Sequence, residues 1–477
     1  MPTQTTSSGR CPNRKMSSYQ KLFVAWIILS LFVISTGTVF GGDVYAIKGA
    51  TIIPVTSDTI KSGTIILRGG IIDDVGQSVT IPPDAMVIEA ESLIIYPGLI
   101  DAHTNLCMPV PKEKKEDGES ARNQDTGEAF APERFSWKLL KPTKELLEKR
   151  FGMGITTALS VPDKGIFIGQ STLINLGDTE PAHMVLKPVV AMHLGYTSQK
   201  EYPNTLMAII AYQKQCFYNA QHHKNLWDRY NQIKRGIKRP EPNESLDALI
   251  PVLERNLPVI ITANEENEIR RAVKLARQFG LEYMISGATE GWRVVDVLKA
   301  ENKPVLLSMN YPKPEDVTGY SYLLEVEGPA KEEKKESKKD DAAKEKSKDE
   351  EKIPEIFKNA AILYKAGIHF AFTSFGMKKT EDFLKNIKKA IAHDLPADAA
   401  LRALTIQPAR IFGVAEQTGS IEAGKIANLV ITDGDIFDEN TTVKYVFIDG
   451  KKMDLQEKKK PEKKKNAEKR KDEDFSY

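Results

Sequence analysis

The middle of the chain alternates short apolar runs with stretches whose apolar residues recur at helical spacing. One unit begins with the apolar run 259–263, continues with helical spacing from Ile269 to Phe279, and stops at Gly280. Strands that alternate with helices in this way predict an α/β fold with a parallel sheet and crossover helices. We therefore expect residues 97–413 to form a TIM-type (β/α)8 barrel, with its reactive end at the carboxyl ends of the strands.

Further units of the same kind follow along the middle section. They are expected at residues 283–286 with a helix from about Trp292, at 304–308, and at 368–373 with a helix after Lys379. The pattern does not locate the third and fourth strands of the barrel, although a short strand is expected at 189–191.

The two ends of this middle section are rich in short β-type runs. The expected strands are residues 50–55, 64–68, 71–75, 86–88, 428–432 and 443–448. Those before the middle section predict a small antiparallel sheet. Near the other end, Asp449-Gly450 predicts a tight hairpin turn.

The N-terminal segment has the order of an export signal. Basic residues from Arg10 to Lys21 precede an apolar run from Leu22 to Ile34, and small residues follow. This order is typical of a signal peptide, which we expect to cover residues 1–42. Because the apolar run extends to Phe40, an uncleaved membrane anchor formed by residues 22–40 is the alternative. In both cases the body of the protein is expected to be exported to the periplasm or another extracytoplasmic compartment.

Charge is unevenly distributed along the chain. The formal net charge is only +2, so the central part is not expected to bind nucleic acid. Residues 331–352 form a charged insertion that we expect to be solvated. Residues 456–477 are expected to be a disordered basic tail, which together with the N-terminus offers contact with a membrane or envelope. Cys107 and Cys216 are expected to be unpaired thiols.

The segment from Tyr96 to Asn105 looks like the metal-binding strand of a hydrolase. His103 and Asn105 are two residues apart, so a strand would place both side chains on one face. Two imidazoles there would make half of a metal site, whereas one imidazole and one carboxamide make a poorer one. Asp101 is expected to orient the turn of this strand.

At both ends the chain resembles the amidohydrolase superfamily, in particular its imidazolonepropionase-like and dihydroorotase-like branch. The resemblance rests on residues 49–53, 97–103, 154–157, 403–411 and 419–430. It implies a metal-dependent hydrolase of carbon-nitrogen bonds other than peptide bonds. It also implies a small composite β-sandwich domain, built from residues 43–96 and 414–455, beside the barrel.

The resemblance also shows where ligands are missing. The family holds one or two divalent metals by a His-x-His pair, single histidines ending the fifth and sixth strands, and an aspartate ending the eighth. Here His103 matches the first ligand, but Asn105, Asn264, Gly287 and Phe375 stand at or beside the other strand ends. A catalytic zinc needs about three protein ligands. We therefore predict a vestigial or weak metal site at His103, no bound cofactor, and a weakly active or non-catalytic protein.

A non-standard ligand set around His103 stays open, with one zinc or manganese ion held by His193 and carboxylates. Glu265 and Glu266, however, fit the first turn of a helix, and Glu290 fits a cap of the helix from Trp292. A lone histidine at a strand end is more often hydrogen-bonded packing than a ligand. The candidate pocket around His103 comprises Asn105, His193, Asn264, Glu290 and Phe375.

Three functions are consistent with these residues. The first is an exported, non-catalytic barrel that acts with a partner, such as a homodimer or a heterodimer with a related amidohydrolase. The alternative is an active metal-dependent hydrolase of a cyclic amide or dipeptide-like substrate. The third is an envelope protein whose basic tail and charged insertion carry the function. An exposed apolar stripe on the helix after Tyr202 would mark a subunit contact.

Overall fold

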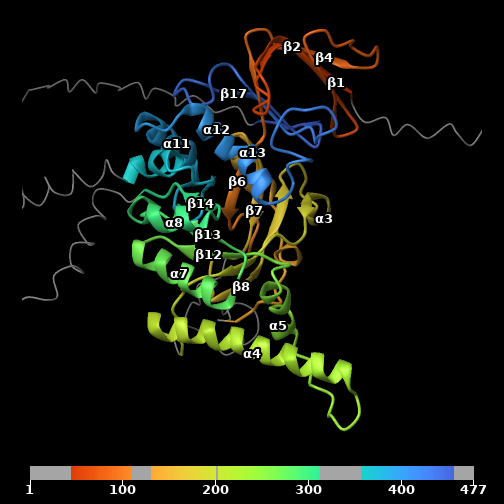
Figure 1. Ribbon diagram of the computed structural model, residues 1–477. Helices are drawn as coiled ribbons and strands as arrows, with labels where there is room; N and C mark the ends of the chain where they lie inside the picture. The colour runs from red at the N-terminus through yellow and green to blue at the C-terminus, as the bar shows by residue number, and fades with distance from the viewer. Residues whose placement is uncertain (1–43, 110–129, 200–201, 312–355, 456–477) are drawn as a thin grey trace, which may run out of the picture. The chain divides into compact units, whose positions relative to one another are not determined.

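The computed structural model describes residues 44–109, 130–199, 202–311 and 356–455 (Figure 1). The expected signal or anchor, the charged insertion and the basic tail lie outside these residues. Among the helices of the described ranges, none is long and apolar enough to cross a membrane. Cys107 and Cys216 are both buried free thiols.

Strands from the two ends of the chain share one eight-stranded sheet. Its order is β18-β17-β16-β5-β1-β2-β3, and β4 pairs with β1 beside this path. The strands are β1 (Tyr45–Ile52), β2 (Ile60–Arg68), β3 (Ile71–Gly76), β4 (Met86–Glu89), β5 (Ile94–Pro97), β16 (Leu429–Thr432), β17 (Val443–Ile448) and β18 (Lys451–Lys452). Asp449 and Gly450 both have positive φ and form the hairpin turn between β17 and β18, as predicted.

The β1 strand changes partner halfway along, and this corrects two expectations. Its first half pairs in parallel with β4, its second half pairs in parallel with β5, and β2 runs antiparallel to it. The sheet is therefore mixed and branched, whereas the sequence predicted a small antiparallel sheet and a sandwich. The change falls at Gly49, where φ is 85° and the register with β2 shifts. A glycine at a bulge bends the strand, which frees its second half for another neighbour.

The middle of the chain forms two further sheets, a four-stranded one that is mainly antiparallel and a six-stranded one that is mainly parallel. One has the order β10-β9-β7-β6 and the other has the order β15-β14-β13-β12-β11-β8. Their strands are β6 (Leu99–Thr104), β7 (Ile155–Ser160), β8 (Phe167–Gln170), β9 (Thr172–Asn175), β10 (Val185–Lys187), β11 (Met192–Leu194), β12 (Val259–Ala263), β13 (Tyr283–Gly287), β14 (Val305–Ser308) and β15 (Phe370–Thr373). Parallel pairing runs from β11 through β15 and between β6 and β7.

These two sheets differ from the expected barrel, in which eight parallel strands would form one closed sheet. Only Ser171 separates β8 from β9, so one extended segment enters both sheets and runs antiparallel to its neighbours β11 and β7. On the other side, side chains connect β6 with the end of β15. Thr373 Oγ1 donates to the His103 carbonyl, and the Ser374 amide donates to Asp101 Oδ1 over 2.9 Å. Within the described residues no strand ladder closes this side.

Helices cover the outer face of these strands (Figure 1). The α-helices are α2 (Lys144–Phe151), α3 (Pro181–Met184), α4 (Leu206–Gln232), α5 (Glu244–Asp247), α6 (Ile250–Leu253), α7 (Glu266–Phe279), α8 (Val295–Glu301), α11 (Phe383–Ala392), α12 (Ala397–Leu404) and α13 (Ile406–Ile411). Residues 356–365 are also helical, and 3-10 turns lie at η1 (Ser136–Lys138), η2 (Gly291–Val294) and η4 (Thr380–Asp382). The α7 helix ends at Gly280, which is left-handed with φ 63°, as the sequence predicted.

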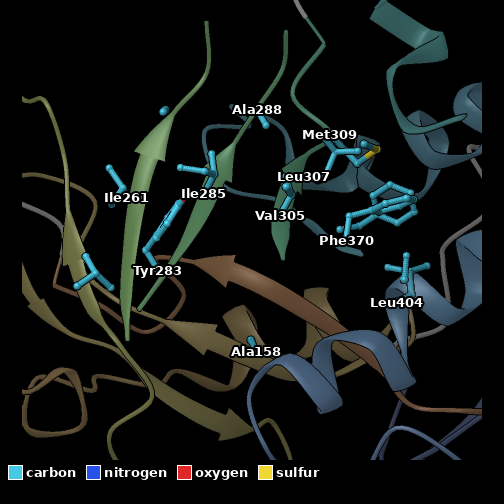
Figure 2. Packing of buried hydrophobic residues seen from close by; sticks show 14 of the residues in the cluster. Ala158, Ile261, Tyr283, Ile285, Ala288, Val305, Leu307, Met309, Phe370 and Leu404 are labelled. Atoms are coloured by element: carbon cyan, nitrogen blue, oxygen red, sulfur yellow. The ribbon is translucent and has the colours of Figure 1, made fainter. Parts of the chain in front are cut away.

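Consecutive strand residues enter two different apolar clusters. Ile261, Ile285 and Leu307 belong to the large cluster that also contains Phe370 and Leu404 (Figure 2). Their neighbours one residue earlier belong to a separate cluster, formed by Ile260, Met284, Leu306, Ile100, Leu159 and Phe412 among others. Side chains of a strand alternate between its two faces, so these strands are apolar on both sides, as strands between helices and an interior must be.

Candidate functional site

Just before the strand that carries His103, the backbone at Gly98 lies very close to the side chain of Thr156. An ideal Cβ on Gly98 would lie 2.1 Å from Oγ1 of Thr156 on β7, so only glycine fits there. Further along, Asp101 pairs with Ala158 and Thr104 with Ser160, which leaves one extra residue on β6. This bulge interrupts the alternation of side chains around His103.

His103 lies between two other rings. Its ring centroid is 3.9 Å from that of Phe375 with an interplanar angle of 12°, so these two rings stack. The His193 ring on β11 meets it edge-on at 4.8 Å. Both histidines are fully buried, whereas Phe375 is partly exposed and covers His103. The sequence placed His193 just after a strand at 189–191, but the structure places it inside β11.

A hydroxyl on the neighbouring sheet fixes the orientation of His103. Its Nδ1 lies 2.6 Å from Oγ of Ser286 on β13. Thr262 on β12 is the register partner of Ser286, so both side chains lie on the same face. The sequence did not predict this contact, and the one indication of it is the position of Ser286 near the end of the expected sixth strand.

Both histidines are held as neutral imidazoles. Burial lowers the pKa of His103 to about 3. Burial and the adjacent His103 hold the pKa of His193 well below its usual value. A neutral imidazole has one N–H donor and one lone pair. At neutral pH the pair therefore offers lone pairs to a ligand without first losing a proton.

Several polar atoms at this site have no hydrogen-bond partner among the described residues. They are Nε2 of His103, both ring nitrogens of His193 and Oγ1 of Thr262. A buried polar atom without a partner costs about 1–3 kcal/mol, so a group of them calls for an explanation. They are the groups in this interior that a polar ligand would satisfy.

Asp101 is buried and linked to four other groups, one of which is the amide of His103, which donates to its Oδ1 over 3.4 Å. The amide of Ser374 donates to its Oδ1 over 2.9 Å, and the hydroxyl of Ser374 donates to its Oδ2. Nη1 of Arg150, on α2, lies 3.7 Å from Oδ2. Burial raises the pKa of Asp101, and the nearby Arg150 opposes this effect. Asp101 therefore attaches β6 to the segment after β15, whereas the sequence predicted that it would orient the turn of its own strand.

Asn105 does not join His103. It is exposed, and its Nδ2 donates to Oδ2 of Asp163 over 3.4 Å. The prediction of a shared face assumed a regular strand through Asn105, but β6 contains a bulge and ends at Thr104. The alternation rule therefore does not apply between these two positions.

Asn264 and Glu290 lie at the start of α7. The Glu290 carboxylate accepts from the Glu266 amide over 3.0 Å, so its side chain caps α7. The sequence predicted instead that Glu290 caps the helix from Trp292, and its side chain makes no cap bond there. The Asn264 carbonyl accepts from the Glu290 amide over 2.9 Å. Glu265 is the N-cap of α7 and Glu266 its first residue, as the sequence indicated.

The donors at the centre do not fit a catalytic metal. The His103 ring contacts the His193 imidazole, the Ser286 hydroxyl and the Phe375 ring. No group of three or more His, Cys, Asp or Glu side chains in the described residues could hold a metal ion. Two neutral nitrogens without a carboxylate or a third imidazole are fewer than the three ligands of a typical catalytic zinc. A shallow cavity of about 210 Å³ lies elsewhere, lined by Lys303 and His369, which precede β14 and β15.

Two curated sequences match a short part of the chain. The 5-methylthioadenosine/S-adenosylhomocysteine deaminase of Pyrococcus furiosus is 38% identical over 71 residues, which are 15% of this chain and 17% of the relative. Dihydropyrimidinase 1 of Caenorhabditis elegans is 37% identical over 71 residues, 15% of this chain and 14% of the relative. The chain thus matches less than two thirds of either relative.

Solved structures match most of the chain. The amidohydrolase from Thermotoga maritima MSB8 has a TM-score of 0.68 at 22% identity, over 86% of this chain and all of that chain. A prolidase complexed with N-methylphosphonate-L-proline has a TM-score of 0.50 at 14% identity, over 87% of this chain and all of that chain. At such identities the likeness concerns the fold, a TIM barrel with a β-domain.

The α/β fold with its β-domain, and His103 on β6, thus agree with the fold of metal-dependent hydrolases. The model of the Amidohydrolase family matches residues 94–453. This match covers most of the chain, and the chain belongs to the Amidohydrolase family.

Proposed function

We propose that this chain is a non-catalytic member of its family, whose barrel binds a partner instead of hydrolysing a carbon-nitrogen bond. The observation that supports this proposal is the environment of His103. The Phe375 ring stacks on one face of the imidazole, and Ser286 binds its Nδ1. A metal that activates water needs an open position and about three protein ligands. Neither a phenyl ring nor a hydroxyl supplies them.

Metal analysis and a hydrolysis screen test this proposal together. The full chain is purified without a polyhistidine tag, and its zinc, manganese and iron contents are measured. We expect less than stoichiometric metal and no turnover of cyclic amides or dipeptides above a His103→Ala control. Stoichiometric metal and turnover that are both lost in His103→Ala would contradict the proposal.

A second candidate is an active hydrolase of a cyclic amide or dipeptide-like substrate with one zinc or manganese ion near His103. It is favoured by the unpartnered nitrogens of His103 and His193. The structurally similar prolidase, which holds a proline-containing phosphonate, suggests dipeptides as the first substrates to test. If this candidate is right, His193→Ala abolishes turnover as completely as His103→Ala, whereas His222→Ala leaves it unchanged.

The partner that we propose is a second copy of this chain or a related amidohydrolase. Apolar side chains along α4 support a contact there, since Met207 is 83% exposed, Tyr218 49% and Leu226 41%. Exposed apolar residues that lie along one helix often mark a subunit contact. Light scattering is expected to show a dimer for the native chain and a monomer for the double variant Met207→Glu, Tyr218→Glu. A dimer unchanged by both substitutions would exclude α4 as the contact.

The same proposal includes a closed barrel and export of the protein. The segment shared by β8 and β9, and the side-chain bonds between β6 and the end of β15, support a single barrel. The basic and apolar order of residues 1–42 supports export. Mass mapping of the N-terminus and cell fractionation test export. A full-length chain in the cytoplasm would refute it.

A further inference from the structure

The two buried histidines lie at a separation that one metal ion can bridge. Metal–nitrogen distances are about 2.0–2.1 Å, so two imidazoles on one ion have ring centroids roughly 4.5–5.5 Å apart. The rings of His103 and His193 are 4.8 Å apart and inclined by 62°. Three of their four ring nitrogens have no partner among the described residues. The two rings are therefore close enough to share one ion, and they lack a third ligand among the described residues.

Ser286 prepares His103 for such a role. Its hydroxyl lies against Nδ1, and a proton on Nδ1 that is donated to this hydroxyl leaves the lone pair on Nε2. Nε2 is the nitrogen without a partner. Histidines that bind metals commonly donate their other nitrogen to a neighbouring acceptor in this manner.

Phe375 is held in place by its own backbone. Its amide donates to Oγ1 of Thr373 over 3.0 Å, and its carbonyl accepts from Oγ of Ser308 over 2.9 Å. Thr373 Oγ1 in turn donates to the His103 carbonyl. These bonds do not depend on the phenyl ring, so another side chain at position 375 would start from the same backbone position beside His103.

We propose that residue 375 decides whether this barrel holds a metal ion. A ligand side chain at this position completes a three-ligand site with His103 and His193, whereas the side chain of Phe375 has no donor atom for a metal. The inference rests on the proposed non-catalytic function, because it explains how the native chain stays without metal. It also makes a claim of its own, namely that one substitution is sufficient to restore binding.

Two substitutions supply a third ligand by different chemistry. Phe375→Asp adds a carboxylate, and Phe375→His adds an imidazole that keeps an aromatic ring against His103. Phe375→Asn is the matched control for the charge, and Phe375→Leu removes the ring without adding a donor. The full chain carrying each substitution is titrated with Co²⁺ and Zn²⁺, while visible absorption and equilibrium dialysis report binding. Near-ultraviolet circular dichroism shows that each variant is folded.

We expect Phe375→Asp or Phe375→His to bind one ion per chain at least about 100-fold more tightly than the native chain. Phe375→Asn and Phe375→Leu are expected to bind as weakly as the native chain. Adding His193→Ala to the binding variant is expected to abolish the gain, because only two ligands then remain.

Three results would overturn the inference. A folded Phe375→Asp or Phe375→His chain without increased binding would show that position 375 does not complete the site. Equal binding by Phe375→Leu would show that the ring acts only by its bulk and that no third ligand is needed. Binding that survives His193→Ala would place the ion elsewhere. Stoichiometric metal in the native chain would instead refute the proposed function.

Discussion

His103 and His193 are stable in the fold only as neutral side chains, because burial disfavours their charged forms. An unfolded histidine takes up a proton near pH 6.5. In the folded protein the pKa of His103 is lowered to about 3, and that of His193 is also well below its usual value. Between these limits the unfolded chain binds more protons than the folded chain, so acid favours unfolding.

We therefore predict that the free energy of unfolding falls as the pH drops below about 6.5, by roughly 1.4 kcal/mol per pH unit for each histidine. The loss from His103 continues towards pH 3. Asp101 opposes it, since burial raises its pKa and the folded chain gains its proton first. Urea unfolding at a series of pH values measures the slope.

Paired variants isolate the contribution of His103. His103→Gln is expected to unfold with a shallower pH dependence, while His222→Gln, at an exposed position, should keep the native slope. The same slope in His103→Gln and the native chain would mean that His103 is not neutralised by burial.

Individual residues of the site could be chosen from sequence, but their partners could not. His103, His193 and Phe375 were all predicted, and the structure brings their rings together. Ser286 was not predicted, because 183 positions separate it from His103 along the chain. Asn105 was predicted by strand alternation, which fails at a bulge that only the pairing of β6 with β7 defines.

At the level of elements, two carboxylates cap the start of α7, and one of them, Glu290, was a candidate metal ligand. Oε2 of Glu268 accepts from the amide of Asn264 over 2.8 Å, and Glu290 accepts from the amide of Glu266. The first amides of a helix have no partner within it, so these carboxylates satisfy them and complement the helix dipole. A side chain used in this way is not available to a metal at His103.

We predict that Glu290→Ala and Glu268→Ala each lower the free energy of unfolding by about 1 kcal/mol, the usual value of a lost cap. Chemical denaturation measures this loss, and metal content and any turnover are expected to stay as in the native chain. Lys299→Ala, on the surface of α8, serves as the control. A change in metal content or turnover in Glu290→Ala with unchanged stability would instead indicate a ligand.

Elements with a strong local signal were predicted well. The strand at 259–263 and the helix that ends before Gly280 match β12 and α7. The segment of β8 and β9 was not located, because every one of its strand residues is buried and shows no alternation. Its antiparallel direction depends on distant strands β7 and β11. No local pattern contains this information.

For the molecule as a whole, the C-terminal strands are part of the N-terminal sheet. β16 pairs with β5, and Leu429, Ile431 and Phe447 join Ile47 and Ile65 in one buried cluster. Burying an apolar side chain of this size contributes about 1.5–3 kcal/mol to stability. The burial of Leu429, Ile431 and Phe447 is therefore comparable in size with the net free energy of unfolding of many domains.

We predict that a chain ending at residue 413 does not fold. It would leave β5 and the apolar cluster without the strands that cover them. A chain ending at residue 455 keeps β16 to β18 and is expected to melt at the native temperature. Circular dichroism melting and solubility compare the two chains. Cooperative melting of the shorter chain at the native temperature would contradict this role of the C-terminal strands.

The pairing of β5 also determines when, during synthesis, the β-sheet of the two chain ends can be assembled. Its neighbours are β1, which precedes it, and β16, which follows the whole barrel. Synthesis at about 5–20 residues per second delivers β16 on the order of tens of seconds after β5. During that time β5 presents an open edge, which is a template for wrong pairing. The sheet is therefore completed only after the intervening segment has been synthesised, and the edge of β5 stays open to wrong pairing until β16 arrives.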